Sequence, residues 1–424
     1  MIQRRARQLR RRVDAWIDDY AEFDATGVFG PSETQHFQYD HLDRLTHAWT
    51  TGDAGGAYDR SYVYDQIGNI LAKGDTGSEL VYGYGQAAQG IAPGAKPHAV
   101  THVGGVERYQ YSPNGNMRFR DRDGDGALEQ DIRYTLENKV ESVTVDGTTT
   151  TYFYDGNGVR VKKEVYDGLT YEDTYYVGGI YEEKYESMLP DPEVTKYYFA
   201  GSQRVAMRVS DGVSSTVTYL HGDHLGSTSL ATDGSGEAVS LQHYYPYGET
   251  RSTNGTLPTD FQYTGQRHDS TIKLLDYNAR WYDSLTGRFI SPDTIIPDPA
   301  NPQSLNRYSY VYNNPCNLVD PSGHCGEGSS PGEGVSQERH DRLCWIREQA
   351  LALSERTGLP VDDPDYLTDV GAMALLFDIV APEYSRWYGS RRADFVYDLG
   401  VVVGGIEVQG NMSVSYTHLR AHET

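Results

Sequence analysis

The sequence predicts a mainly β protein built as an array of repeated hairpins, and three observations support this. The chain of 424 residues contains 35 Tyr and 45 Gly, against only 10 Phe and 5 Trp. Tyr suits the pleated surface of strands, and Gly supplies the positive φ angles of tight turns. Leu at helical spacing is missing over most of the chain. A Tyr followed by a turn also recurs every 20 to 27 residues, at Tyr39, Tyr64, Tyr84, Tyr111, Tyr134 and Tyr154.

The repeat unit is predicted to be a strand that ends in Tyr-Asp, a turn and a second strand. Its clearest copies are FQYDHLDRL, YVYDQIGNIL and YFYDGNGVRV. In the second copy, Asp65 can accept hydrogen bonds from nearby backbone N–H groups, and Gly68-Asn69 can take left-handed turn geometry. One hairpin cannot bury its apolar face alone, so neighbouring copies must stack and place Tyr ladders along one face. This predicts repeats over residues 31–165 and a continuing Tyr-rich β shell over residues 166–263.

Both ends of the chain differ from this pattern. Residues 1–30 are basic and have no apolar signal-peptide run, so they predict a short amphipathic helix or an internal start in a longer protein. Residues 325–340 are rich in Gly and Ser and predict a linker. Residues 341–413 carry apolar side chains at helical spacing and predict the helical start of a truncated further domain. Residues 414–424 resemble a translated sequencing adapter and are left out of the fold prediction.

Charge and cysteine content exclude several classes of function. The net charge of −23 argues against nucleic-acid binding by the shell, because phosphate contacts need a basic face. No stretch of 18 apolar residues occurs, so no transmembrane segment is expected. The three cysteines form neither a disulfide framework nor a zinc pattern. We therefore expect no cofactor.

The second half of the chain is similar to a known domain. Four segments, YLHGDHLGSTSLATDGSG, YYPYGE, FQYTGQRHDSTIKLLDYNARWYDSLTGRFISPD and NPQSLNRYSYVYNNPCNLVDPSGH, resemble the RHS repeat-associated core domain, and the repeats before them resemble the YD/RHS repeat family. Together these resemblances cover residues 31–324. They imply that the repeat hairpins form a spiralling β-sheet shell, that residues 264–324 plug one end of it, and that the polypeptide after the plug is a variable, toxin-like effector.

The same resemblance implies a self-cleavage site in the plug. The family's Arg and two Asp residues fall on Arg280, Asp293 and Asp320, and the cut is expected near His324. Two carboxylates can share a proton, so that one acts as a base on water and the other as an acid. A nearby Arg can hold one carboxylate charged or stabilise an oxyanion. The alternative is that these Asp residues only form turns and caps in a plug that never cleaves.

This chain departs from the family's pattern at three places. Thr294 follows Asp293 where Pro is usual. The insert IIPDPANPQS lengthens the stretch before Asp320, and its Asp298 could be mistaken for the first Asp of the motif. His324 replaces the more common Leu.

An acidic segment, FRDRDGDGALEQD, offers a weak calcium candidate. Asp121, Asp123, Asp125 and Gly126 occupy positions 1, 3, 5 and 6 of an EF-hand loop. The twelfth position, however, is Ile132 rather than Glu. We therefore favour an acidic hairpin turn, and a weak calcium site in a β loop is the alternative.

Two further clusters are weaker still. His221 and His224 are close enough to share a metal, but no third ligand is evident, so a structural turn is favoured. The basic residues between Arg386 and Arg392 are interpreted as a solvated surface rather than a phosphate contact. No enzymatic motif is recognisable in residues 325–413.

The functional hypothesis is therefore a secreted or cell-surface shell protein. It encapsulates and presents its own C-terminal effector domain and releases it by self-cleavage near His324. Its further partners would be secretion machinery, a target-cell surface and an immunity protein. The alternative is an extracellular structural or adhesion repeat protein without toxic cargo.

Overall fold

The computed structural model describes residues 2–5, 15–19, 33–52, 56–85, 97–294, 296 and 301–324, except residues 157, 190 and 202. The chain divides into two compact units, residues 1–329 and 330–424, and the description concerns the first. The predicted linker, the helical segment of residues 341–413, the tail of residues 414–424 and the basic cluster Arg386–Arg392 lie outside the described residues.

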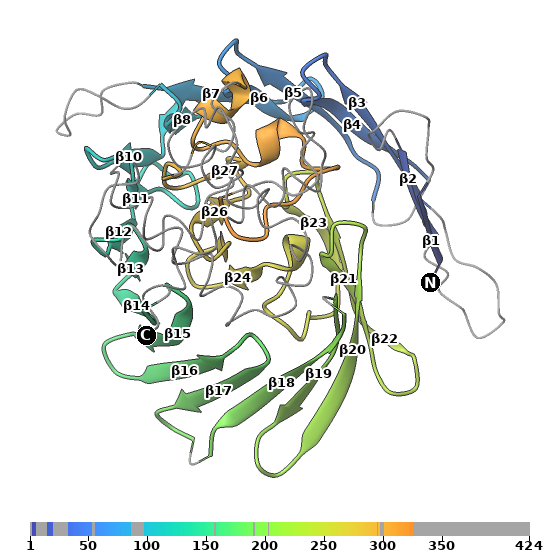
Figure 1. Ribbon diagram of the computed structural model, residues 1–424, viewed down its shortest axis with the longest axis vertical. Coiled ribbons are helices and arrows are strands. Elements are labelled where there is room, and N and C mark those ends of the chain that lie inside the picture. The colour runs from blue at the N-terminus through green and yellow to red at the C-terminus, as the bar shows by residue number, and fades with distance from the viewer. Residues whose placement is uncertain are drawn as a thin grey trace, which may run out of the picture. The chain divides into compact units, whose positions relative to one another are not determined.

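The shell consists of antiparallel strands in which each strand pairs with the next along the chain (Figure 1). The first nine strands form one sheet: β1 (Ile2–Arg5), β2 (Ala15–Asp19), β3 (Glu33–Tyr39), β4 (Leu45–Gly52), β5 (Asp59–Tyr64), β6 (Ile70–Asp75), β7 (Leu80–Tyr84), β8 (Val100–Val103) and β9 (Val106–Glu107). The next fourteen form a second: β10 (Tyr109–Tyr111), β11 (Met117–Arg120), β12 (Gln130–Tyr134), β13 (Val140–Val145), β14 (Thr148–Tyr154), β15 (Arg160–Tyr166), β16 (Tyr171–Val177), β17 (Tyr181–Glu186), β18 (Glu193–Ala200), β19 (Gln203–Ser210), β20 (Ser215–Gly222), β21 (Thr228–Thr232), β22 (Ala238–Tyr244) and β23 (Thr250–Asn254).

The N-terminal segment corrects one prediction. Its described residues form the strands β1 and β2, where a helix was one of the two expectations for residues 1–30. β2 pairs with β3, and β1 pairs with β2, in antiparallel register. The free backbone edge of β3 offers hydrogen-bond partners that a lone amphipathic helix would leave unused, so sheet pairing overrides the local helical pattern.

The turns between strands follow the predicted Asp chemistry. Asp65 Oδ1 accepts hydrogen bonds from the backbone N–H groups of Ile67 and Asn69 at 2.9 and 2.8 Å, and Gly68 takes a φ of +79°. The carboxylate thus satisfies the backbone where the chain reverses. Asp155 accepts the second of these bonds, from Val159, and both bonds recur at Asp40, Asp223 and Asp233. The last two lie in the segment that lacks Tyr-Asp pairs, so the Asp turn persists there without its Tyr.

The predicted Tyr ladder links one repeat to the one before it. In four repeats the Tyr hydroxyl donates a hydrogen bond to the carbonyl of the residue that begins an earlier strand. These bonds run from Tyr64 to Leu45 (2.6 Å), Tyr84 to Ile70 (2.8 Å), Tyr134 to Met117 (2.8 Å) and Tyr154 to Val140 (2.7 Å). Each ring fills the core while its hydroxyl is satisfied, which explains why Tyr is favoured over Phe here.

The plug is a small sheet that lies inside the curve of the shell strands (Figure 1). It comprises β24 (Arg267–Asp269), β25 (Leu274–Asp276), β26 (Trp281–Asp283) and β27 (Arg288–Phe289), with the 3₁₀ helices η1 (Tyr263–Gly265), η2 (Pro302–Leu305) and η3 (Val311–Asn313) around it. Its own core is a cluster of aromatic rings, including Tyr263, Tyr277, Tyr282, Phe289 and Tyr310. The larger shell core also includes plug side chains such as Trp281 and Ile290, so plug and shell are packed as one body.

Buried charged side chains bind the plug to the shell. Arg288, 2% exposed, donates to the carbonyls of His98 (2.9 Å) and Gly68 (3.1 Å) in the shell. Arg120 of β11 pairs with Asp283 of β26 at 3.1 Å. These contacts fix the plug's loops, and with them the candidate site.

Candidate self-cleavage site

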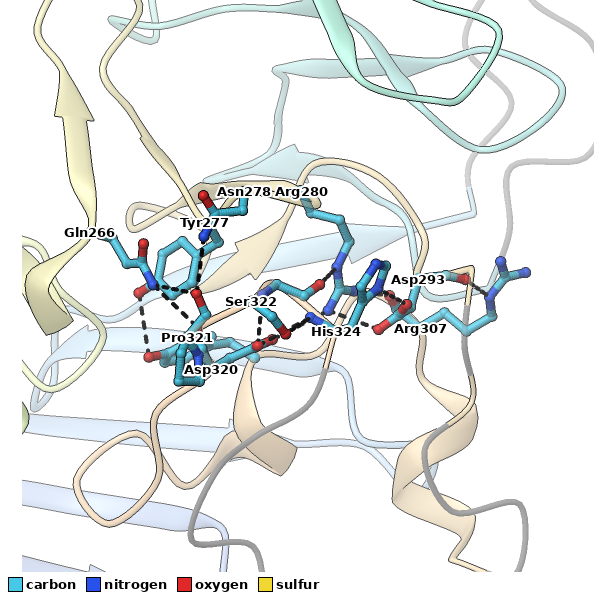
Figure 2. A network of polar contacts seen from close by, with 12 residues as sticks. Gln266, Tyr277, Asn278, Arg280, Asp293, Arg307, Asp320, Pro321, Ser322 and His324 are labelled. Atoms are coloured by element: carbon cyan, nitrogen blue, oxygen red, sulfur yellow. Dashed lines mark hydrogen bonds and ion pairs between the residues drawn. The ribbon is translucent and has the colours of Figure 1, made fainter. Parts of the chain in front are cut away.

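The three side chains that the resemblance singled out meet in the plug (Figure 2). Arg280 directly precedes β26, Asp293 follows β27, and Asp320 lies in the last described turn. Arg280 Nη2 lies 2.9 Å from Asp293 Oδ2 and 3.5 Å from Asp320 Oδ2. All three residues are buried. One guanidinium thus contacts both carboxylates and neutralises part of their charge. Burial separates all three groups from water.

A tight turn presents the backbone at the end of the plug. Asp320 Oδ1 accepts hydrogen bonds from the N–H groups of Gly323 (2.8 Å) and His324 (3.1 Å). Gly323 has a φ of +83°, and a Cβ there would lie 2.5 Å from the Tyr277 carbonyl oxygen. Only Gly therefore fits this position without strain.

The Gly323–His324 peptide group is hydrogen-bonded at both ends. Arg280 Nε donates to the Gly323 carbonyl oxygen, and the His324 N–H donates to Asp320. The His324 ring lies against the other carboxylate, with Nδ1 2.8 Å from Asp293 Oδ1 (Figure 2). A cation on a carbonyl oxygen polarises it toward attack, and a carboxyl group at the nitrogen is placed to supply a proton.

One of the two carboxyl groups, Asp320, holds its proton more tightly than an ordinary Asp. Burial raises the pKa of Asp320 to about 7, an effect that Arg280 opposes, that the charge of Asp293 reinforces and that His324 opposes. Asp320 can therefore carry a proton near neutral pH, while Asp293 lies against Arg280 on one oxygen and His324 on the other. The Arg280 guanidinium also stacks over the Phe289 ring at 3.6 Å from its centre, which fixes its plane.

Arg307 organises the same site, although sequence reasoning did not select it. Its carbonyl oxygen accepts hydrogen bonds from Arg280 Nη1 (2.9 Å) and from the Asp293 N–H (2.8 Å), and its Nε donates to the Asp293 carbonyl. A cavity of about 30 Å³ borders the charged residues, which is room for about one water molecule. It is also lined by Ser304, Asn306, Ser309, Val311 and Tyr312.

Two residues, Asp293 and Asp298, could match the family's first Asp. Asp293 contacts Arg280 through its Oδ2 atom. Asp298 lies outside the described residues. The insert that follows Asp293 leads into η2, from which the chain returns through Arg307 to the site.

The calcium candidate takes a different set of residues from the one predicted. Asp121 and Asp123 lie with Glu129, not Asp125, within 4.8 Å of one another. Asp125 instead accepts a hydrogen bond from a backbone N–H two residues on, at 2.7 Å. Asp121 likewise accepts from the N–H of Gly126 at 3.0 Å. These bonds close the loop between β11 and β12, and both the acidic turn and the weak calcium site stay predictions.

The two histidines of the HGDH segment face different partners. His221 Nε2 lies 3.0 Å from Thr232 Oγ1, and His224 Nε2 lies 3.1 Å from the Cys316 carbonyl oxygen. Both contacts tie strands and loops together, as a structural turn requires. Cys316 is a buried free thiol, and the other two cysteines lie outside the described residues.

Sequence comparisons agree with this architecture. Residues 30–316 match the family model of the teneurin YD-shell. The chain is 29% identical over 227 residues to the tRNA nuclease WapA of Bacillus subtilis, covering 51% of this chain and 9% of that protein. It is 31% identical over 211 residues to the toxin subunit YenC1 of Yersinia entomophaga, covering 44% of this chain and 21% of that protein. It thus spans at most about a fifth of these relatives.

A vertebrate protein and a solved structure also match part of the chain. Teneurin-1 of Gallus gallus is 27% identical over 231 residues, covering 52% of this chain and 8% of that protein. The crystal structure of TcdB2-TccC3-TEV aligns with a TM-score of 0.43 and 18% identity, over 70% of this chain and 19% of that one. Among the described residues, we find no helix with the length and apolarity that a bilayer crossing needs. Because the family model matches more than half of its residues, the chain belongs to the teneurin YD-shell family of RHS/YD-repeat proteins.

Proposed function

We propose that this chain supplies the shell and plug of a toxin-like RHS protein, which encloses and presents the polypeptide after the plug and releases it by cutting its own backbone beside His324. The observation that carries this proposal is the Gly323–His324 peptide group, hydrogen-bonded to Arg280 at its oxygen and to Asp320 at its nitrogen. The relatives include proteins named as a tRNA nuclease and a toxin subunit, which supports the link to effector delivery.

The chemistry is the hydrolysis of one peptide bond by water. The water oxygen bonds to the carbonyl carbon, and the proton of the water passes to the pair formed by the Asp293 carboxylate and the His324 ring that contacts it. Arg280 stabilises the negative charge that develops on the carbonyl oxygen. The carbon–nitrogen bond then breaks, and the departing nitrogen takes the proton that Asp320 holds near neutral pH. The products are a new carboxyl group and a new amine.

Self-cleavage is tested by expressing the full chain and analysing it on a denaturing gel. We expect a released piece of about 100 residues, since the chain has 424 residues and the cut lies beside residue 324. Its N-terminal residue, read by mass spectrometry, should lie within one position of His324. Asp320→Asn and Asp293→Asn should abolish the cut, while Asp233→Asn, in an exposed shell turn, should not. An intact wild-type chain would refute self-cleavage.

The same proposal implies which partners the protein has. The first partner is the chain's own C-terminal domain, and export to the cell surface or medium would require secretion machinery. A toxic cargo would also call for an immunity protein in the producing cell. Co-purification of the released piece with the shell after cleavage, and its loss in denaturant, would support encapsulation.

The alternative, a surface structural protein, has one specific observation in its favour. Salivary gland surface protein 1 of Aedes aegypti is 29% identical over 202 residues, covering 41% of this chain and 5% of that protein. A chain that stays intact, and whose Asp320→Asn variant behaves as the wild type, would favour that alternative.

A further inference from the structure

His324 occupies the position where the family usually has Leu, and its ring makes a specific polar contact there. Its Nδ1 lies 2.8 Å from Asp293 Oδ1, while Asp293 Oδ2 lies 2.9 Å from Arg280. An ionised carboxylate can only accept hydrogen bonds, so the ring nitrogen facing it must carry the hydrogen. In the neutral ring this leaves Nε2 with the lone pair.

A carboxylate that fixes one imidazole tautomer, with the second nitrogen left basic, is the arrangement by which histidine acts as a general base. We propose that His324, oriented by Asp293, is the catalytic base of the self-cleavage and takes the proton of the attacking water at Nε2. This inference rests on the proposed function and assigns to the chain a catalytic group that a Leu at this position would not supply.

The charged groups around the ring are compatible with this role. Asp293, Asp320, Arg280 and Arg307 line the same small cavity as His324, and they come from four separate segments of the plug. The two carboxylates favour the protonated imidazole that forms during the reaction, and the two guanidiniums limit this preference. The cavity of about 30 Å³ has room for about one water molecule beside the ring.

Each proton in this scheme has a donor and an acceptor. Water adds its oxygen to the carbonyl carbon and gives one proton to His324 Nε2. The carbon–nitrogen bond breaks, the nitrogen leaves with the proton of Asp320, and the carbonyl oxygen, stabilised by Arg280, returns to a double bond. The imidazolium then restores the proton of Asp320 through solvent. Water is the only co-reactant.

Two variants separate a catalytic from a structural role. His324→Gln keeps a hydrogen-bond donor toward Asp293 but has no basic nitrogen, and His324→Leu restores the family's usual residue. The full chain is made by cell-free synthesis, transferred to buffers between pH 5 and 9, and its cleavage followed with time on gels. General-base catalysis contributes about 100-fold or more, so at neutral pH we expect His324→Gln to be slower by about that factor.

The pH profile gives the sharper readout. In the wild type the rate should rise with pH in acid, where a proton on Nε2 would remove the base, and fall as Asp320 loses its proton above a pKa of about 7. In His324→Leu the rising limb should shift along the pH axis, because another group must then take the proton of the water. Added imidazole should restore part of the rate to His324→Ala.

The outcomes distinguish this inference from the proposed function. Should both His324→Gln and His324→Leu cleave at the wild-type rate with the wild-type pH profile, His324 is not the base, although self-cleavage stands. A wild type that stays intact at every pH, or an Asp320→Asn variant that still cleaves, overturns the proposed function itself. Circular dichroism of each variant verifies that the β shell has formed.

Discussion

Asp320 combines two tasks, and the second of them follows from its burial. Its oxygen binds the N–H groups that shape the final turn, and its removal from water favours the protonated carboxyl. A fully solvated Asp could do the first but not the second. The neighbouring Arg280 limits the effect, because a nearby cation stabilises the charged form. The balance leaves a carboxyl group able to hold and release a proton close to neutral pH.

This balance makes the stability of the plug depend on pH. The folded pKa of Asp320, about 7, lies above the ordinary value of 3.8, so between these values the folded chain binds a proton that the unfolded chain releases. Its contribution to stability is therefore present in acid and is lost as the pH rises through about 7. Asp320→Asn should flatten the decline of the free energy of unfolding between pH 4 and 7. Urea titrations of both proteins across that pH range measure the free energy of unfolding. If it declined equally with pH in both proteins, the prediction would be contradicted.

Gly323 is the second residue on which the turn depends. Gly323→Ala should destabilise the turn by about 1–3 kcal/mol, because the left-handed φ and the contact with the Tyr277 carbonyl both oppose a Cβ. Thermal unfolding measures this cost, and the self-cleavage rate should fall with it. Gly147→Ala is a suitable control, since that glycine has a similar φ and open space around it. Equal cleavage by both variants would show that the turn's geometry is not needed.

At the scale of the elements, the repeat is held together by a few local and near-local interactions. An Asp side chain closes the turn within four residues, and a Tyr hydroxyl reaches back to the strand before it. The first interaction fixes the residue at which the chain reverses. The second fixes the position of each Tyr-bearing strand relative to the strand before it. The Tyr bond is kept in copies that have lost the Asp, at Tyr84 and Tyr134, which explains why these degenerate copies still form the same sheet.

The Tyr ladder predicts a specific stability difference. Tyr134→Phe removes the hydroxyl that bonds to the Met117 carbonyl at 2.8 Å and should lower the free energy of unfolding by about 0.5–1.5 kcal/mol. Tyr171→Phe, at an exposed position of β16, should change it by less than about 0.5 kcal/mol. Denaturant titration of both variants decides the matter. Equal effects would mean that the hydroxyl contact does not contribute.

At the scale of the whole unit of residues 1–329, strands far apart in the sequence are brought together. Arg251 of β23 pairs with Glu33 of β3 at 2.7 Å, and both side chains are almost fully buried. The loop before β23 also packs its rings on β5 and on the residue before it, with Tyr247 against Tyr62 of β5 and Tyr245 against Tyr58. The last shell strands thus close on the first ones, and the plug is packed between them.

Breaking this closing ion pair should cost much more than removing an exposed cation. Arg251→Met leaves the Glu33 carboxylate buried without its cation, which typically costs about 3–5 kcal/mol. The double variant Arg251→Met with Glu33→Gln should recover part of that loss, because the neutral amide is easier to bury. Arg208→Met, at an exposed position of β19, is the control. Melting temperatures of these four proteins and of Glu33→Gln alone provide the comparison, and a double variant whose loss equals the sum of the two single losses would argue against the pairing.

The sequence by itself determined the features that depend on neighbouring residues. Tyr-Asp turns, alternating strands and their order along the chain follow from local backbone chemistry, which a short segment carries with it. The tertiary structure alone decided the rest. The backbone edge of β3 pairs with the strand β2, where the sequence led us to expect a helix or an internal start, and Glu129 rather than Asp125 lies beside Asp121. The meeting of Arg280, Asp293 and Asp320 was implied only by a resemblance, and the contact of His324 with Asp293 by nothing in the sequence, because such contacts depend on how distant segments pack.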